Sequence, residues 1–271
     1  MLINGRSCDS VAVLDRGLQY GDGVFETIAF IQGKAPLWDR HMARLTAGCK
    51  ALALPRQDVV RLADEARQLL HSDDALCGRH VVKIIITRGE HGSAYFPGQG
   101  DATRILYTRS WPQRTQQAGI EGVVLYRCQT RLASGSPLAG LKTLNRLEQV
   151  IAAAEIKKAG FQEGLLCDAD GFMVEALTSN LFWLKQGELY TPVLDRCGVS
   201  GVMRAEVIEQ AKHFGIGVHE VRERPGILDS AQAMFLSNAL GLKVVTEFSG
   251  RRMDVSAVPL KIRTAIQQLL S

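Results

Sequence analysis

The chain has 271 residues, 46% hydrophobic and 22% charged, so it is long enough for two domains and is expected to bury a sizeable core. Its net charge of +4 comes from basic residues that are spread along the sequence, a pattern that gives no support to a nucleic-acid partner. Its six cysteines form no cluster with metal-ligand spacing, and no apolar run is long enough for a signal peptide or a membrane span, so we expect a cytoplasmic protein without a metal or a membrane partner.

The first 112 residues mix strand and helix patterns. Runs of β-branched and aromatic residues predict three strands, at 24–31, 81–87 and 104–108. Helical spacing predicts two helices, at 38–53 with Asp39 as N-cap and at 57–70. A polar stretch over 110–117 follows, where we place a domain boundary. The expected domains are a small N-terminal α+β domain over 1–112 and a larger C-terminal domain over 113–271.

The second part opens with a predicted strand at 122–126 and a loop of small residues that leads to Lys142. A helical pattern follows from Leu144 to Lys158, so Lys142 is expected just before a helix. Short strand patterns then predict a meander of hairpins, followed by a helix, three strands and a closing helix. The predicted ranges are 164–167, 172–175, 180–184 and 189–191 for the meander, then 202–214, 218–222, 233–237, 244–248 and 260–270.

Lys142 is the first residue that could take part in a chemical reaction. Partial burial beside Leu141 and Leu144, and the positive end of the expected helix dipole, would both lower the pKa of its amine. A Schiff-base nucleophile needs such a lowered pKa in order to attack a carbonyl. Taken alone, a lysine in such a loop is far more often a solvated surface side chain.

Three other features have the residue types of a site for a phosphorylated ring cofactor. Glu175, at the end of a hairpin, is either an exposed carboxylate or the partner of a protonated pyridine nitrogen. The glycine-punctuated segment 198–204 enters a helix whose first N–H groups suit a phosphate, unless Ser200 simply caps it. Arg44 either clamps a phosphate or pairs with a surface carboxylate. A lysine, a carboxylate, an arginine and a helix start together meet the needs of a pyridoxal-phosphate site.

The sequence resembles the fold-type IV pyridoxal-phosphate enzymes, the branched-chain and D-amino-acid aminotransferase-like family, and the matching segments follow in order over nearly the whole chain. These segments are 15–27 (DRGLQYGDGVFET), 40–45 (RHMARL), Lys142, 175–182 (EALTSNLF) and 198–204 (GVSGVMR). The resemblance implies a two-domain α/β (α+β) fold with pyridoxal 5'-phosphate in the cleft between the domains. It also implies a homodimer that completes each site.

Residue roles follow by position from the resemblance. Lys142 would form the Schiff base, Glu175 would bond the pyridine nitrogen and Arg44 would bind phosphate. The phosphate cup would be completed by backbone amides of Val202 and Met203 with Asn238 and Ala239. Thr27 would be a catalytic residue, and the substrate side would be formed by Arg88, Tyr95, Tyr107, Arg109 and Arg146.

The loop 88–95 (RGEHGSAY) departs from the related lyases, which have an inner arginine where this chain has Ser93 or Ala94. Another arginine, Arg146 or Arg109, is therefore expected to bind the carboxylates of the substrate.

Within the family, three segments are similar to the aminodeoxychorismate lyases: 139–150 (AGLKTLNRLEQV), 190–204 and 237–240 (SNAL). This similarity implies a lyase that converts 4-amino-4-deoxychorismate to 4-aminobenzoate and pyruvate in folate biosynthesis. Two alternatives remain at this point. One is a D-amino-acid or branched-chain aminotransferase that uses the same lysine, and the other is a non-catalytic protein that binds pyridoxal phosphate.

Overall fold

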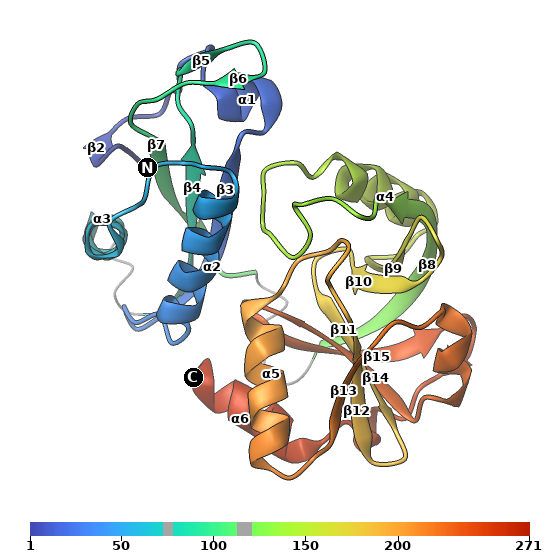
Figure 1. The fold of residues 1–271 in the computed structure, drawn as a ribbon. Helices are drawn as coiled ribbons and strands as arrows, with labels where there is room; N and C mark the ends of the chain where they lie inside the picture. The colour runs from blue at the N-terminus through green and yellow to red at the C-terminus, as the bar shows by residue number, and fades with distance from the viewer. Residues whose placement is uncertain (73–77, 113–120) are drawn as a thin grey trace. The chain divides into compact units, whose positions relative to one another are not determined.

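The computed structural model describes residues 1–72, 78–112 and 121–271 and divides the chain into two compact units (Figure 1). Unit 1 comprises Met1–Pro112 together with Leu141–Asn145, and unit 2 comprises Gln113–Gly140 and Arg146–Ser271. The short segment that carries Lys142 therefore packs with unit 1, although it lies within the C-terminal range expected from the sequence. Residues 113–117 of the expected linker lie outside the described residues.

Unit 1 is built on an antiparallel sheet of five strands in the order β2-β1-β7-β4-β3. The strands are β1 (Leu2–Ile3), β2 (Arg6–Ser7), β3 (Gly23–Ile31), β4 (Arg79–Thr87) and β7 (Thr103–Ser110). The three strands predicted from β-forming runs are thus confirmed, and they are neighbours in the sheet. Helices α2 (Trp38–Ala51) and α3 (Val59–Ser72) contribute to the same hydrophobic core as this sheet.

Side chains of the sheet alternate between its two faces, as the pleat requires. Val24 and Ile28 of β3 and Ile84 of β4 are buried in the core with Leu45 of α2 and Leu62 of α3. Phe25 and Thr27 therefore lie on the opposite face of β3. This second face carries the polar residues of interest in unit 1.

Both predicted helices of unit 1 are present, with corrections at their N-terminal ends. Leu37, not Asp39, is the N-cap of α2, and Asp39 lies in the first turn. Val60, in the first turn of α3, is 69% exposed. Leu62 of the same helix lies in the core.

Unit 1 also contains short elements that the sequence did not reveal, namely α1 (Arg16–Tyr20) and a hairpin of β5 (Gly92–Ser93) and β6 (Phe96–Pro97). Asp15 caps α1 by accepting from Gly17 N at 2.8 Å. Gly21 ends the helix with φ of 67°, a left-handed conformation that glycine adopts without strain. Elements this short show no hydrophobic period.

Unit 2 contains a nine-stranded sheet in the order β10-β9-β8-β15-β14-β11-β12-β13, with β16 paired to β15. Its strands are β8 (Glu121–Leu132), β9 (Glu163–Asp168), β10 (Met173–Ala176), β11 (Asn180–Lys185), β12 (Glu188–Pro192), β13 (Val218–Val221), β14 (Ala233–Asn238), β15 (Gly241–Phe248) and β16 (Arg251–Arg252). The pairs β9–β10 and β11–β12 are hairpins as predicted. They do not form one meander, because β8, β15 and β14 lie between them in the strand order.

The helices of unit 2 are α4 (Leu147–Lys158), α5 (Val202–His213) and α6 (Leu260–Leu269), with 3-10 turns η2 (Pro225–Ser230) and η3 (Val255–Ala257). The expectation that the α4 helix starts at Leu144 is wrong, because Leu144 belongs to the segment that pairs with β3. Lys142 is therefore not at a helix start.

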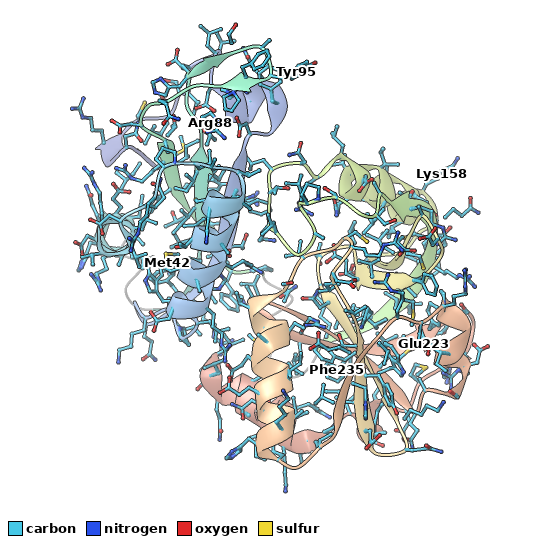
Figure 2. All side chains as sticks on the ribbon, viewed as in Figure 1. Met42, Arg88, Tyr95, Lys158, Glu223 and Phe235 are labelled. Carbon is cyan, nitrogen blue, oxygen red and sulfur yellow. The ribbon has the colours of Figure 1, made fainter. Side chains whose placement is uncertain are left out.

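Each unit has its own hydrophobic core. Met42 of α2 marks that of unit 1, and Phe235 of β14, stacked on Phe182 at 5.0 Å between ring centroids, lies in the interior of unit 2 (Figure 2). One apolar stripe stays outside these cores: Leu147, Val150 and Ile151 of α4 are 78%, 61% and 59% exposed. Among the described residues, no helix is long and apolar enough to cross a membrane.

Candidate functional site

Lys142 lies along the outer edge of β3. Phe25 N donates to Lys142 O at 2.9 Å and Leu144 N donates to Gly23 O at 3.0 Å, while Val24 and Thr143 form an antiparallel bridge. This register turns the half-buried Lys142 side chain to the Phe25 face, where its Nζ lies 4.4 Å from the centroid of the Phe25 ring. The ring and the partial burial replace the helix dipole that we expected around this amine.

A polar row crosses the same face of the sheet. The strand register pairs Thr27 of β3 with Lys83 of β4, and Lys83 with Tyr107 of β7. Directly paired residues point to the same face, so these three side chains lie side by side. Arg109 follows Tyr107 by two residues on β7 and therefore lies on this face as well. The structure thus brings Thr27, Tyr107 and Arg109 together, as part of one surface.

Lys83 is the residue of this surface that the sequence reasoning missed. Its Nζ lies 4.6 Å from the centroid of the Phe25 ring, the same ring that Lys142 contacts. Burial, and secondly the positive charge of Arg109, lower the pKa of Lys83. The signal in the sequence is one charged residue inside the apolar run that we assigned only to a strand.

Arg44 of α2 is paired with a carboxylate, as one of its two sequence interpretations proposed, but this carboxylate is not on the surface. Its Nε and Nη2 donate to Glu26 of β3 at 2.7 and 2.5 Å. Glu26 is 0% exposed, and the Arg44 side chain is 11% exposed. Arg44 is therefore held at the boundary of the unit 1 core.

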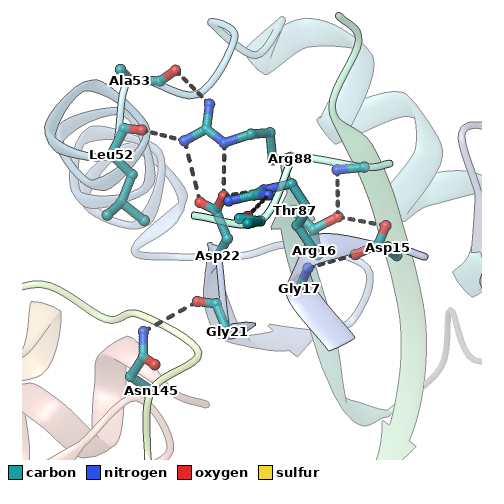
Figure 3. A network of polar contacts seen from close by, with 12 residues as sticks. Asp15, Arg16, Gly17, Gly21, Asp22, Leu52, Ala53, Thr87, Arg88 and Asn145 are labelled. Carbon is teal, nitrogen blue, oxygen red and sulfur yellow. Dashed lines mark hydrogen bonds and ion pairs between the residues drawn. The ribbon is translucent and has the colours of Figure 1, made fainter. Parts of the chain in front are cut away.

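Arg88 is the centre of a polar network at the end of β4 (Figure 3). It donates to both oxygens of Asp22, from Nε at 2.7 Å and from Nη2 at 3.2 Å, and also to the carbonyls of Leu52 and Ala53. Asp22 accepts from Arg16 Nε as well. Burial would raise the pKa of Asp22, but the hydrogen bonds from the two arginines lower it. These contacts indicate a structural role, and the role of Arg88 in substrate binding stays a prediction.

Tyr95 lies on the β5–β6 hairpin and is 84% exposed (Figure 2). Its ring lies 5.6 Å from that of Tyr20, and Arg16 Nη1 holds the hairpin by donating to Ala94 O at 2.6 Å. Tyr95 thus lies on a hairpin outside the sheet that carries Thr27 and Tyr107. Arg146, in unit 2, is the N-cap residue of α4.

In unit 2, Glu175 of β10 is 5% exposed and accepts a hydrogen bond from Val199 N at 2.9 Å. Asn180 Nδ2 donates to Val199 O at 2.9 Å, so both sides of this peptide segment are held. The bonds fix the loop that leads into α5. Glu175 is therefore a buried carboxylate, not the exposed strand-end residue of the alternative interpretation.

No side chain of the described residues caps the N-terminus of α5. Its N-cap is Gly201, so Ser200 does not cap the helix, and a Cβ at Gly201 would lie 2.0 Å from Asn180 Oδ1. The first N–H groups, among them those of Val202 and Met203, have no acceptor within a helix. Such uncapped N–H groups and the helix dipole favour an anion.

The β14–β15 hairpin carries Asn238 and Ala239. Asn238 Nδ2 donates to Ser179 Oγ at 3.1 Å and its Oδ1 accepts from Leu240 N at 2.9 Å. Ser237, before it, is 1% exposed and pairs directly with Asn180, so its hydroxyl is on the face where Asn180 meets Gly201. Within the described part of the chain, Ser237 Oγ has no hydrogen-bond partner. A buried hydroxyl with this placement suits a bound polar ligand.

The described residues contain no cluster of His, Cys, Asp and Glu that could hold a metal ion.

Comparison with known proteins identifies the class of protein. Residues 23–248 match the amino-transferase class IV family. The chain therefore belongs to this family, as its motifs predicted.

Several relatives belong to the lyase branch. The chain is 32% identical to an aminodeoxychorismate lyase of Vibrio harveyi over 91% of this chain and 90% of the relative. The crystal structure of 4-amino-4-deoxychorismate lyase from Pseudomonas aeruginosa is 39% identical, with a TM-score of 0.85 over 99% of this chain and 97% of that one.

Aminotransferases of the family are also similar, among them the Escherichia coli branched-chain amino acid aminotransferase, at 25% identity and a TM-score of 0.84 over 98% of this chain and 91% of that one. The predicted α/β (α+β) fold of this family is confirmed.

Proposed function

We propose that the protein is a pyridoxal-phosphate-dependent lyase that converts 4-amino-4-deoxychorismate to 4-aminobenzoate and pyruvate. The observation that carries this proposal is the pair of cations, Lys83 and Arg109, on the face of unit 1 that also carries Lys142. The substrate has two carboxylates, whereas a branched-chain amino acid presents one carboxylate and an apolar side chain. Two cations on the face of the sheet that carries the reactive lysine therefore favour the lyase substrate, in agreement with the similarity to lyases from two organisms.

The residues present fit pyridoxal 5'-phosphate. The uncapped start of α5, with Val202 and Met203, and the Ser237 hydroxyl, which has no hydrogen-bond partner among the described residues, suit the phosphate in unit 2. Arg44 in unit 1 suits it as well, since a guanidinium matches phosphate oxygens. Glu175 is the buried carboxylate for the pyridine nitrogen. Asn238 and Ala239 complete the set assigned to phosphate.

When bound, the cofactor draws electrons from the carbon that carries the amino group of the substrate. Lys142 would hold the cofactor covalently, would give up this bond to the amino group of the substrate, and would re-form it as the amine of 4-aminobenzoate leaves. Between these two steps its Nζ accepts the proton from ring carbon 4. The electron pair of that C–H bond moves into the ring, and the bond between carbon 3 and the enolpyruvyl oxygen breaks.

The proton held by Lys142 Nζ is then given to the enolpyruvyl leaving group, which becomes pyruvate. The atoms of substrate and products balance, because the ring loses one proton and one enolpyruvate and becomes 4-aminobenzoate. Lys83 and Arg109 bind and orient the two carboxylates, with Tyr107 and Thr27 beside them. This orientation keeps the ring hydrogen directed at Lys142.

The test is a pair of assays on one preparation of the holoenzyme. In one, 4-amino-4-deoxychorismate is supplied alone, and 4-aminobenzoate and pyruvate are measured. In the other, D- or branched-chain amino acids are supplied with 2-oxoglutarate, and glutamate is measured. The proposal expects fast formation of both products in the first assay. Rapid transamination without 4-aminobenzoate would refute it, and a protein that binds the cofactor without either activity would be a carrier.

We also infer that the working form is a homodimer located in the cytoplasm. The stripe of Leu147, Val150 and Ile151 on α4 supports the dimer, because exposed apolar side chains at this helical spacing are typical of an interface. The five cysteines of the described residues are all free thiols, which agrees with a reducing compartment.

A further inference from the structure

Glu26 is a carboxylate inside the core of unit 1. It lies on β3 between Val24 and Ile28, on the face that packs with α2, and its exposed fraction is 0%. A buried carboxylate without partners costs several kcal/mol, so a core retains one only when it is paired. Helix α2 supplies both partners, His41 and Arg44.

The hydrogen bonds of Glu26 set the orientation of the Arg44 guanidinium. Arg44 approaches with two parallel donors, Nε to Oε1 and Nη2 to Oε2, and His41 Nδ1 lies 2.7 Å from Oε2. His41 and Arg44 are one helical turn apart, so both reach β3 from the same side of α2. Two parallel bonds set the orientation of a guanidinium as well as its position. The Nη1 edge of Arg44 therefore has a defined direction.

The protonation states agree with this geometry. Burial would raise the pKa of Glu26, but the hydrogen bonds from Arg44 and His41 lower it, so the carboxylate is ionised at neutral pH. Burial lowers the pKa of His41 by more than Glu26 raises it. The imidazole is therefore neutral, with its proton on Nδ1, from which it donates to Glu26. Glu26 and Arg44 cancel in charge.

We propose that Glu26 and His41 position Arg44 for the phosphate of the cofactor. The inference rests on the proposed function, in which Arg44 binds that phosphate. Arg44 is the outermost member of the cluster, with a side chain 11% exposed, whereas those of Glu26 and His41 are 1% exposed. Glu26 and His41 thus act through Arg44. Since the ion pair is neutral overall, Arg44 contributes by the direction of its hydrogen bonds more than by long-range attraction.

The experiment compares the dissociation constants of the apoprotein for pyridoxal phosphate and for pyridoxal, which lacks the phosphate. Glu26→Gln keeps the size of the side chain but turns an NH2 toward the donors of Arg44, so the two parallel bonds are lost. We expect pyridoxal phosphate to bind about tenfold more weakly to this variant, with pyridoxal unaffected. Arg44→Lys should show a similar phosphate-specific loss. The double variant should lose no more than either single one, because the residues act as one device.

Three outcomes would contradict either the positioning role of Glu26 or the phosphate-binding role of Arg44. A phosphate-specific loss in Arg44→Lys but not in Glu26→Gln overturns the inference and leaves the proposed function intact. An equal loss for both ligands in Glu26→Gln also overturns it, because the ion pair would then be purely structural. Unchanged affinity of Arg44→Lys removes Arg44 from the proposed phosphate site, and the inference with it.

Thermal unfolding would show whether Glu26→Gln folds. If it does not, a pair of His41 variants tests the same positioning of Arg44. His41→Asn retains a donor near the position of Nδ1 and should bind pyridoxal phosphate like the wild type. His41→Leu removes the donor and should show the phosphate-specific loss. Identical affinities of the two variants for pyridoxal phosphate would contradict a role of His41 in positioning Arg44.

Discussion

The buried charge of Lys83 lowers the stability of the folded protein. It interrupts a strand whose neighbours Val82 and Ile84 are fully buried, and burial is the main reason that its pKa is lowered. A group whose pKa is lowered by folding favours the unfolded chain while it is charged. Such a cost inside a strand is typical of a residue kept for function.

Lys83→Met is therefore expected to stabilise the apoprotein and to impair the enzyme. The methionine keeps the apolar part of the side chain and removes the buried charge, which we expect to raise the thermal unfolding temperature by about 2 °C. At the same time the kcat/KM for 4-amino-4-deoxychorismate should fall at least about tenfold. Lys34→Met, at an exposed turn of the same unit, is the control and should change neither quantity.

The stability difference between Lys83→Met and the wild type also depends on pH in a defined direction. The lowered pKa means that the penalty is absent above the unfolded-state pKa of about 10.4, where Lys83 is neutral in both states. It grows as the pH falls toward the folded-state pKa and is complete below that value. Urea titrations of both proteins should therefore converge at high pH. A difference that stays constant with pH would contradict a buried cation.

Substitution of Lys142 gives the clearest spectroscopic test. Lys142→Ala removes the amine that we propose to hold the cofactor, so the protein mixed with pyridoxal phosphate should lack the yellow absorbance and should not be labelled by borohydride. Lys34→Ala is the matched control and should keep both. Full activity in Lys142→Ala would remove this residue from the chemistry.

At the scale of elements, the uncapped start of α5 depends on one glycine. A side chain at Gly201 would collide with Asn180 Oδ1, and Asn180 would have to release Val199 O. The bond from Val199 N to Glu175 depends on the same loop. The amides that we propose for the phosphate and the carboxylate that we propose for the pyridine nitrogen are thus coupled through this loop.

Gly201→Ala is expected to destabilise the protein by roughly 1–3 kcal/mol, the cost of overpacking, and to weaken pyridoxal-phosphate binding. Chemical denaturation and a cofactor titration measure the two effects. Gly226→Ala is the control, because a Cβ at Gly226 has no neighbour within 4 Å. If Gly201→Ala binds the cofactor like the wild type, α5 does not hold its phosphate.

Elements with a long run of β-forming residues or an amphipathic helical pattern could be predicted from the sequence, among them β3, β4 and α3. The start of α4 could not, because Leu144 continues the apolar spacing of the helix while its backbone pairs with β3. The role of Lys83 could not be predicted for a related reason. Its role depends on Thr27 and Tyr107 on other strands, and pairing between distant segments is not visible in local spacing. Motif resemblance located Lys142 and Glu175 but said nothing of Glu26 behind Arg44.

At the scale of the whole molecule, the exposed stripe on α4 predicts the oligomeric state. Val150→Glu places a charge in the centre of the stripe and should shift the protein from dimer to monomer, as light scattering after gel filtration would show. Val60→Glu is the matched control, since Val60 is 69% exposed and Val150 is 61% exposed. If Val150→Glu stays dimeric, the interface does not include this face of α4.

The fate of the substrate nitrogen tests the lyase reaction most directly. The holoenzyme would be given 4-amino-4-deoxychorismate labelled with nitrogen-15 at the 4-amino group, in the presence of 2-oxoglutarate, and the products would be analysed by mass spectrometry. We predict that the label appears in 4-aminobenzoate, with an equal amount of pyruvate and with no labelled glutamate. Label in glutamate, with no labelled 4-aminobenzoate, would contradict the lyase and identify an aminotransferase.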